Sequence, residues 1–206
     1  MFVQEFMTRD PITVRPESDP LAAIALLKAC GFRHLPVVAS GGTLVGIVDR
    51  TDLESFVALA GSPGVAKRQH RVEQAMTRDV ISVPPDCPLE EAATLMVQHR
   101  IGSLPVVQAG RLVGIITETD IFRQLAAVLG GGSDALRLTV QVPDKPGQLA
   151  ELTWRIASVG GNIPSVVAYP AAQRGRVNIT LRVEGASRET VLDAISPLHG
   201  LEVLQA

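Results

Sequence analysis

The sequence predicts an α+β protein with three small units: two copies of a β-α-β-β-α unit, followed by one β-α-β-β-α-β unit. Three observations support this. A set of landmark peptides occurs twice in the same order, a glycine-rich segment precedes residues 134–206, and apolar residues alternate between periods of about 2 and 3.6 along each unit. The length of 206 residues suits two or three small domains.

The internal repeat covers residues 1–130. The matching peptides are Met7-Thr-Arg-Asp10 with Met76-Thr-Arg-Asp79, Leu35-Pro-Val-Val38 with Leu104-Pro-Val-Val107, and Leu44–Asp52 with Leu112–Asp120. The offset is 69 residues for the first two pairs and 68 for the third. The same peptides in the same order indicate a duplicated domain. We place the copies at residues 1–62 and 63–130, with Gly61–Gly64 and Lys67–Arg71 between them.

Each copy shows the same order of elements. An extended piece, a helix, two β-branched runs split by glycine and a second helix follow one another. The extended pieces are Ile12–Val14 and Ile81–Val83, and the first helices begin at Leu21 and near Leu89. The apolar face of the second helix consists of Leu53, Phe56, Val57 and Ala60 in the first copy, and of Ile121, Leu125, Val128 and Leu129 in the second. This pattern predicts the β-α-β-β-α order twice.

The third unit, residues 134–206, follows the run Gly130–Ser133, a composition typical of flexible linkers. We expect strands at Leu136–Val142, Asn162–Tyr169, Arg176–Val183 and Leu201–Leu204, and helices over Leu149–Val159 and Ser187–Ser196. The order β-α-β-β-α-β is that of a ferredoxin-like split β-α-β fold.

Composition excludes several classes of function. The net charge is −2 and aromatic residues make up 3%, so neither a basic surface nor a stacking platform for nucleic acid is expected. The two cysteines and four histidines are scattered, which predicts no metal site and a reduced compartment, the cytoplasm. No apolar run is long enough for a membrane span. No motif pairs a nucleophile with a base, so we expect no enzymatic activity and no catalytic residues or cofactor.

Thr117 and Asp120 stand where the last strand of the second copy meets a helix. One interpretation is an ordinary capping box, because a hydroxyl followed three residues later by an acid has that spacing. The other is a ligand site, because a helix N-terminus attracts anions and a carboxylate there can bind ribose hydroxyls. The spacing alone fits both interpretations.

The paired copies resemble a tandem of CBS domains, the Bateman module, over residues 1–130. The motifs that match are Met-Thr-x-Asp, Leu-Pro-Val-Val and Gly-h-x-Thr-x-x-Asp, where h is apolar. The resemblance implies that Thr117 and Asp120 contact the ribose and phosphate of an adenosine ligand. In the first copy Asp52 keeps the acid, but Asp49 replaces the hydroxyl, which weakens that site for a phosphate. The resemblance also implies that Arg33 and His34 hold a ligand's phosphate in either cleft; a solvated pair at a helix-to-strand turn is the alternative interpretation. The β-branched extended pieces place Ile12, Val14, Ile81 and Val83 beside the base.

Residues 135–206 resemble an ACT domain. The matching peptides are Asp144–Leu149 and Gly160–Ile163. The resemblance implies an amino-acid site at a subunit interface formed by Asp144, Gly147 and Asn162, or an ACT unit that serves only for dimerisation. Ordinary turns at Pro146-Gly147 and Asn162 are the alternative interpretation.

The function predicted from these features is that of a regulatory sensor similar to acetoin-utilisation B-type proteins. An adenine nucleotide (AMP, ADP, ATP or S-adenosylmethionine) binds between the CBS units, and the ACT unit forms a homodimer or binds a second metabolite. Two alternatives stay open. One is an amino-acid sensor with a structural CBS pair, and the other is a ligand-free interaction subunit of a metabolic enzyme.

Overall fold

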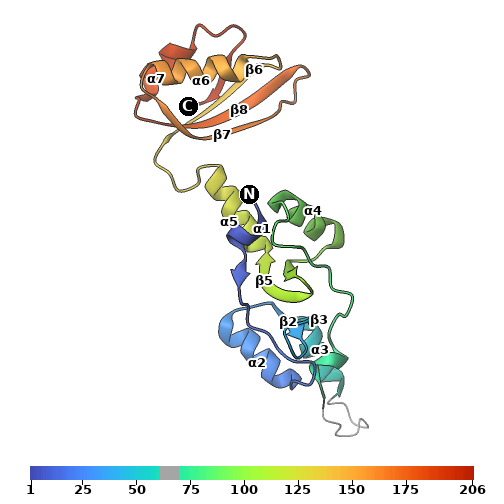
Figure 1. Cartoon of the computed structure of the whole chain (residues 1–206). Coiled ribbons are helices and arrows are strands. Elements are labelled where there is room, and N and C mark those ends of the chain that lie inside the picture. Colours follow the sequence, from blue (N-terminus) through green and yellow to red (C-terminus); the bar gives the residue numbers. More distant parts are fainter. Residues whose placement is uncertain (61–69) are drawn as a thin grey trace. The chain divides into compact units, whose positions relative to one another are not determined.

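A computed structural model describes residues 1–60 and 70–206 and divides them into two compact units, Met1–Phe122 and Arg123–Ala206 (Figure 1). The division falls inside a helix rather than at the glycine-rich run. The predicted linker Gly61–Gly64, and with it the boundary at residue 62, lies outside the described residues, as do the first three residues of Lys67–Arg71.

The first unit contains the two predicted copies. Its elements are α1 (Val3–Phe6), β1 (Thr8–Arg9), α2 (Pro20–Cys30), β2 (His34–Val38), β3 (Leu44–Asp49), α3 (Arg50–Ala60), the 3-10 helix η1 (Val72–Gln74), α4 (Leu89–His99), β4 (Ser103–Gln108), β5 (Arg111–Thr117) and α5 (Glu118–Val128), which continues into the second unit. Each copy thus contributes a helix, an antiparallel hairpin and a second helix. The predicted extended pieces are single bridges, Val14 to Val37 and Val83 to Val106, rather than strands.

Local signals set the ends of the first helix in each copy. Asp19 caps α2 by accepting a hydrogen bond from the Leu21 amide at 3.1 Å, and Pro20 occupies the first turn. The α2 helix ends at Gly31, whose φ of 68° is the left-handed conformation that glycine adopts without strain. The equivalent position after α4 is Arg100, which takes the same conformation with φ 56°.

The N-terminal peptide of each copy packs on the other copy. Strand β1 pairs with β5, so that Thr8 lies opposite Ile115, and Thr77 exchanges both backbone hydrogen bonds with Ile47 in β3 at 2.9 and 3.0 Å. Val3 is buried in the core of the second copy together with Val83, Leu104 and Ile116, while Val72 is buried in the core of the first. Residues 1–62 and 63–130 are therefore units of sequence whose starting segments are exchanged in the fold.

The second unit has the predicted ferredoxin-like order. Its elements are β6 (Leu136–Pro143), α6 (Gln148–Ser158), β7 (Asn162–Pro170), β8 (Arg176–Glu184), α7 (Arg188–Ile195) and β9 (Glu202–Gln205). The antiparallel sheet has the order β7-β8-β6-β9, and both helices cover one face of it (Figure 1). Leu138, Val140 and Val142 alternate toward the helices and form the core with Leu152 and Ile156. On the opposite face, β6 and β8 carry polar side chains, among them Thr139, Gln141, Asn178 and Thr180.

The residues on either side of the glycine-rich run contact side chains of this sheet. The Arg182 guanidinium donates to the Leu129 carbonyl at 3.5 Å and to the Ala135 carbonyl at 3.1 Å, and the Ser165 hydroxyl donates to the Val128 carbonyl. A Cβ at Gly130 would lie 2.6 Å from the Arg182 side chain. Gly130 also has a φ of 71°, a left-handed conformation that glycine adopts without strain.

The apolar face predicted for α5 is largely exposed. Ile121 packs partly against the second core, whereas Leu125, Val128 and Leu129 remain exposed. A 3.6-residue period identifies an amphipathic helix but not the surface that covers it. The prediction of the helix is confirmed, and its inward face is limited to the first turn.

Candidate functional site

The first cavity of the CBS-like unit has a volume of about 330 Å³ and draws residues from both copies. Its lining consists of Thr8, Asp10, Pro11, Ile12, Gly31, Phe32, Arg33, His34, Pro36, Ile115, Thr117, Thr119 and Asp120. Arg33 lies in the turn before β2, His34 begins β2, and Thr117 and Asp120 lie at the junction of β5 and α5. The cavity therefore has carboxylates, hydroxyls, cationic groups and apolar walls, the mixture that a nucleotide requires.

Thr117 and Asp120 form a complete capping box. The Asp120 carboxylate accepts hydrogen bonds from the Thr117 amide at 3.0 Å and the Thr117 hydroxyl at 2.7 Å, and the Thr117 hydroxyl accepts one from the Asp120 amide at 3.3 Å. Both residues also line the cavity. The capping interpretation and the ligand interpretation are thus compatible, because the same contacts that begin α5 hold both side chains at the cavity wall.

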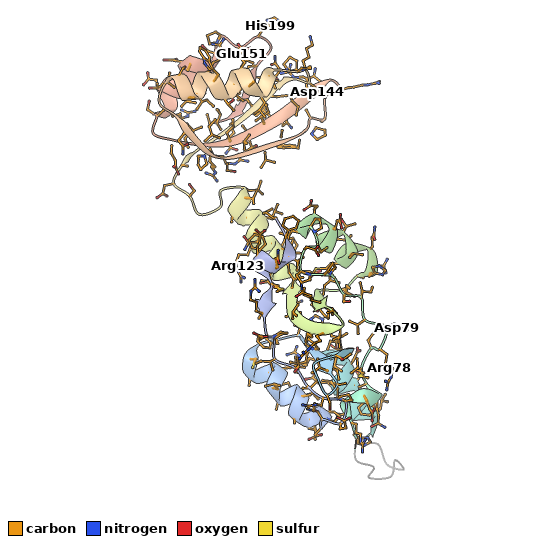
Figure 2. The ribbon with its side chains drawn as sticks, in the orientation of Figure 1. Arg78, Asp79, Arg123, Asp144, Glu151 and His199 are labelled. Atoms are coloured by element: carbon orange, nitrogen blue, oxygen red, sulfur yellow. The ribbon has the colours of Figure 1, made fainter. Side chains whose placement is uncertain are left out.

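A second cavity of about 210 Å³ is lined by the equivalent residues of the other copy. Its lining consists of His34, Ile47, Asp49, Thr77, Asp79, Val80, Ile81, Arg100, Ile101, Gly102, Ser103 and Pro105 (Asp79 is labelled in Figure 2). Thr77 and Asp79 correspond to Thr8 and Asp10 of the first cavity. The two cavities are thus lined by equivalent residues, as expected for copies paired about a pseudo-twofold axis, and His34 lines both.

Asp49 changes the character of the second cavity. Its carboxylate caps α3 by accepting a hydrogen bond from the Asp52 amide at 2.7 Å, as Thr117 does in the other copy. Burial and the negative charge of Asp49 raise the pKa of Asp52 above its usual value. Asp52 itself lines neither of the two cavities. The second cavity thus has the Asp49 carboxylate where the first has the Thr117 hydroxyl, and this negative charge repels phosphate.

Arg100 supplies the second cavity with a cation that sequence reasoning missed. Gly102 and Ser103 take the positions of Arg33 and His34, so the sequence offered no basic group from the second copy itself. Arg100 lines the cavity from the left-handed position after α4, where the first copy has Gly31. A non-glycine residue in this conformation costs about 1–2 kcal/mol. The sequence did contain a signal for this role, because Arg100 in the second copy stands where Gly31 ends the helix of the first.

His34 predicts a pH dependence of stability. Burial lowers its pKa most strongly, Arg33 lowers it further, and the carboxylates of Asp49 and Glu118 oppose both. The unfolded chain, with a histidine pKa near 6.5, therefore binds a proton before the folded chain does. The contribution of neutral His34 to the free energy of unfolding is therefore complete above pH 6.5 and is lost as the pH falls below that value. The free energy of unfolding then changes by at most about 1.4 kcal/mol per pH unit.

Chemical denaturation at pH 7.5 and 5.5 measures this slope in the wild type and in His34→Gln. We expect a smaller loss of unfolding free energy in the variant. His99→Gln is the matched control, because His99 is exposed in the last turn of α4 and should leave the slope unchanged. Equal slopes for all three proteins would contradict the assignment to His34.

The structure brings together some of the predicted nucleotide residues and separates others. Ile12, Arg33, His34, Thr117 and Asp120 line the first cavity, while Ile81 lines the second. Their contacts with a ligand stay a prediction. Two residues predicted beside the base lie elsewhere, namely Val14 and Val83, which are buried in the two cores. The period-2 rule failed for them because each extended piece has only one bridging residue and no continuous strand.

Sequence reasoning also left out the polar residues of the repeated Met-Thr-Arg-Asp peptide. Thr8 and Asp10 line the first cavity, and Thr77 and Asp79 line the second. Asp10 has a φ of 44°, a left-handed conformation that aspartate tolerates better than most residues. The signal was present, since the repeat preserves a hydroxyl and an acid that no helix cap explains.

The residues predicted for an amino-acid site on the ACT-like unit lie at opposite ends of the sheet. Asp144 follows the end of β6, where Pro143 pairs with Arg176 (Figure 2), and Gly147, with φ 91°, caps α6. Asn162 pairs with Glu184 at the other end of β8. Eight residues of strand separate the two ends by roughly 27 Å. One chain therefore does not bring these residues together.

Within residues 1–60 and 70–206, no three metal-ligating side chains gather at one point. None of the helices in the same ranges has both the length and the apolar composition to cross a bilayer.

Comparison with known proteins identifies both units. The CBS domain model matches residues 3–58 and 72–127, and the TTHA0829-like ACT domain model matches residues 131–205. The chain spans only 23% of the length of several curated relatives that it matches.

Three solved structures are similar to the CBS region. A putative acetoin utilization protein (AcuB) from Vibrio cholerae is 34% identical, with a TM-score of 0.57 over 63% of this chain and 93% of that one. CBSX2 in complex with AMP is 30% identical, with a TM-score of 0.56 over 62% and 97%. The CBS pair of MJ0100, in complex with 5'-methylthioadenosine and S-adenosyl-L-methionine, is 30% identical, with a TM-score of 0.54 over 62% and 97%.

Related CBS pairs thus bind adenosine derivatives, and the CBS model alone covers more than half of this chain. The exchanged N-terminal peptides, the two equivalent cavities and the four-stranded sheet under two helices agree with these matches. The chain belongs to the CBS-domain family, as a tandem CBS pair followed by a TTHA0829-like ACT domain.

Proposed function

We propose that this chain is a regulatory sensor that binds an adenine nucleotide in the cavity lined by Thr117 and Asp120. The observation that carries the proposal is that this cavity gathers the hydroxyl–acid pair of the second copy and Arg33 of the first. In this proposal Asp120 binds the ribose, Arg33 binds a phosphate, and Ile12 and Ile115 contact the base. AMP, ADP, ATP and S-adenosylmethionine are the candidate ligands.

Regulation follows from the position of the cavity between the copies. A ligand that contacts both copies favours the arrangement in which its contacts are complete, and shifts the population toward it. The proposed recipient of this signal is a metabolic enzyme on a separate chain. A cytoplasmic location stays a prediction.

A thermal-shift series tests nucleotide binding. At one hundred times the dissociation constant, a ligand adds about 2.7 kcal/mol to the free energy of unfolding, and the melting temperature rises by several degrees. AMP, ADP, ATP, S-adenosylmethionine and adenosine are compared, with guanosine monophosphate as the control. No shift with any adenosine ligand at millimolar concentration would reject the proposal.

We also propose that the chain forms a homodimer. Support comes from large apolar side chains that this chain leaves in solvent on its helices, among them Leu59 at 72% exposure, Val97 at 79% and Phe122 at 66%. The ACT sheet also ends in two outer strands, β7 and β9, which offer edges for pairing.

The ACT residues Asp144, Gly147 and Asn162 form a joint site only if a second copy supplies one end of the sheet.

Light scattering is expected to give a mass near 44 kDa, twice the 21.9 kDa of one chain. A mass of one chain that stays constant across a hundredfold range of concentration would contradict the dimer.

A further inference from the structure

The face of the ACT sheet opposite its helices carries three cross-strand pairs of polar residues. Gln141 on β6 donates to Asn178 on β8 at 3.0 Å, and the hydroxyls of Thr139 and Thr180 lie 3.1 Å apart. The next pair in register is Arg137 with Arg182. In each of the first two pairs, the two side chains hydrogen-bond to each other. The third pair places two positive charges directly opposite each other, an arrangement that destabilises a sheet.

The contacts of these two arginines leave their charges without a counter-ion. Arg137 donates to the Gln205 side-chain carbonyl, and Arg182 donates from Nε and Nη1 to the carbonyls of Leu129 and Ala135. All of these acceptors are neutral. Within the described residues, neither guanidinium forms an ion pair.

A cavity of about 460 Å³ opens beside the pair. It is lined by Ala126, Leu129, Gly131, Arg137, Val167, Tyr169, Thr180 and Arg182. No carboxylate belongs to this lining, so both charges come from arginine. Val167, Leu129 and Ala126 are the apolar members of the lining, and Thr180 and Tyr169 are polar members.

We propose that this cavity binds a small organic anion whose phosphate or carboxylate group lies between Arg137 and Arg182. Guanidinium groups match both anions because each presents parallel N–H donors to two oxygens. The apolar wall favours a ligand with a short hydrocarbon or ring portion beside the charged group. This site is distinct from the CBS cavities and from Asp144, Gly147 and Asn162, and it does not depend on nucleotide binding.

Bound anion would also order the segment that joins the ACT sheet to α5. Arg182 contacts the backbone of that segment through Leu129 and Ala135, and Gly131 lines the cavity. A ligand that holds Arg182 therefore holds these contacts as well. We expect slower proteolysis of residues 129–135 when the anion is present.

The chain contains one tyrosine, and Tyr169 lines this cavity, so ring-labelled tyrosine gives a single NMR probe of the site. Inorganic phosphate, phenyl phosphate and succinate are titrated into the full chain, with sodium chloride at equal ionic strength as the blank. We expect a saturable shift of the Tyr169 signals. Preference for the two phosphates over succinate identifies a phosphorylated ligand, and the reverse identifies a carboxylate. Absence of a saturable shift with all three probes would overturn the proposal.

Arg137→Gln is the decisive variant. We expect anion affinity to fall roughly tenfold or more, because a charge-assisted contact is lost. Without anion, the variant should be at least as stable as wild type, since the like-charge pair is removed. Arg137→Lys keeps the positive charge but loses the planar set of guanidinium N–H donors, so it should lose less anion affinity than Arg137→Gln. It replaces Arg137→Gln in the test if that variant folds poorly. Arg188→Gln removes the same charge from α7 and should bind as wild type. Unchanged affinity in both Arg137 variants would overturn the site.

Discussion

Asp120→Asn is expected to lower affinity for the adenine nucleotide by tenfold to a hundredfold. The substitution keeps an oxygen that can accept from the Thr117 amide and hydroxyl, now 3.0 and 2.7 Å from the carboxylate. The capping box therefore survives in part, and the free energy of unfolding should fall by about 1 kcal/mol or less. A neutral amide is a weaker acceptor for ribose hydroxyls, and a charge-assisted hydrogen bond is worth about 1.5–3 kcal/mol. At 1.4 kcal/mol per decade, that loss gives the expected change in affinity.

Asp52→Asn is the matched control for Asp120→Asn. It makes the same chemical change at the equivalent position of α3, but Asp52 lines neither CBS cavity. Titration calorimetry on both variants and on wild type separates the roles. Wild-type affinity in a folded Asp120→Asn protein would leave capping as the role of this acid. A larger loss in Asp52→Asn would show that the working acid belongs to the first copy.

Gly114→Ala is expected to destabilise the CBS pair and to weaken binding in the first cavity. Gly114 lies opposite Arg9 where β5 receives β1, and an added Cβ would collide with the Met7 sulfur and lie 3.0 Å from the Thr8 carbonyl oxygen. Overpacking of this kind costs about 1–3 kcal/mol. The flexible Met7 side chain can turn away, but the Thr8 carbonyl belongs to the backbone of β1, which must shift by a few tenths of an ångström. Thr8 also lines the cavity. Chemical denaturation and calorimetry with AMP measure the two effects.

Gly46→Ala tests whether the effect on binding is local. Its added Cβ would lie 2.5 Å from the Met76 sulfur and 3.1 Å from the Thr77 carbonyl oxygen, the equivalent contacts beside the second cavity. We expect a similar loss of stability with little loss of AMP affinity. Wild-type stability in both alanine variants would show that the exchanged peptides adjust without cost. Equal losses of AMP affinity would show that the strain spreads through the whole pair.

Helices and strands were predictable wherever a local signal marks their ends. The predicted helix from Leu21 to about Cys30 is α2, whose cap Asp19 and terminal Gly31 lie in the sequence next to it. The predicted strand Arg176–Val183 is β8, because its alternating pattern faces one core. The exposure of Leu125 on α5 was not predictable, since periodicity records one apolar face and says nothing of what covers it.

The candidate site was predictable in its parts. Thr117 and Asp120 were found because a hydroxyl followed three residues later by an acid is a recognisable capping-box pattern within one helical turn. Arg100 was missed because its role depends on a left-handed backbone position, which the sequence shows only by comparison with Gly31. Val14 was misplaced because a single bridging residue has no alternating pattern to follow.

The sequence by itself determined that the chain contains a duplicated β-α-β-β-α unit and a split β-α-β unit, and which residues begin and end most helices. These features depend on hydrogen bonds and apolar periods within a few residues, so they can be read locally. Only the tertiary structure decided that β1 pairs with the second copy and Thr77 with the first, and that Arg33 therefore shares a cavity with Asp120. The physical reason is that the two copies present nearly the same strand edges and apolar cores. A repeated peptide fits either of them, and its choice depends on how the whole chain packs.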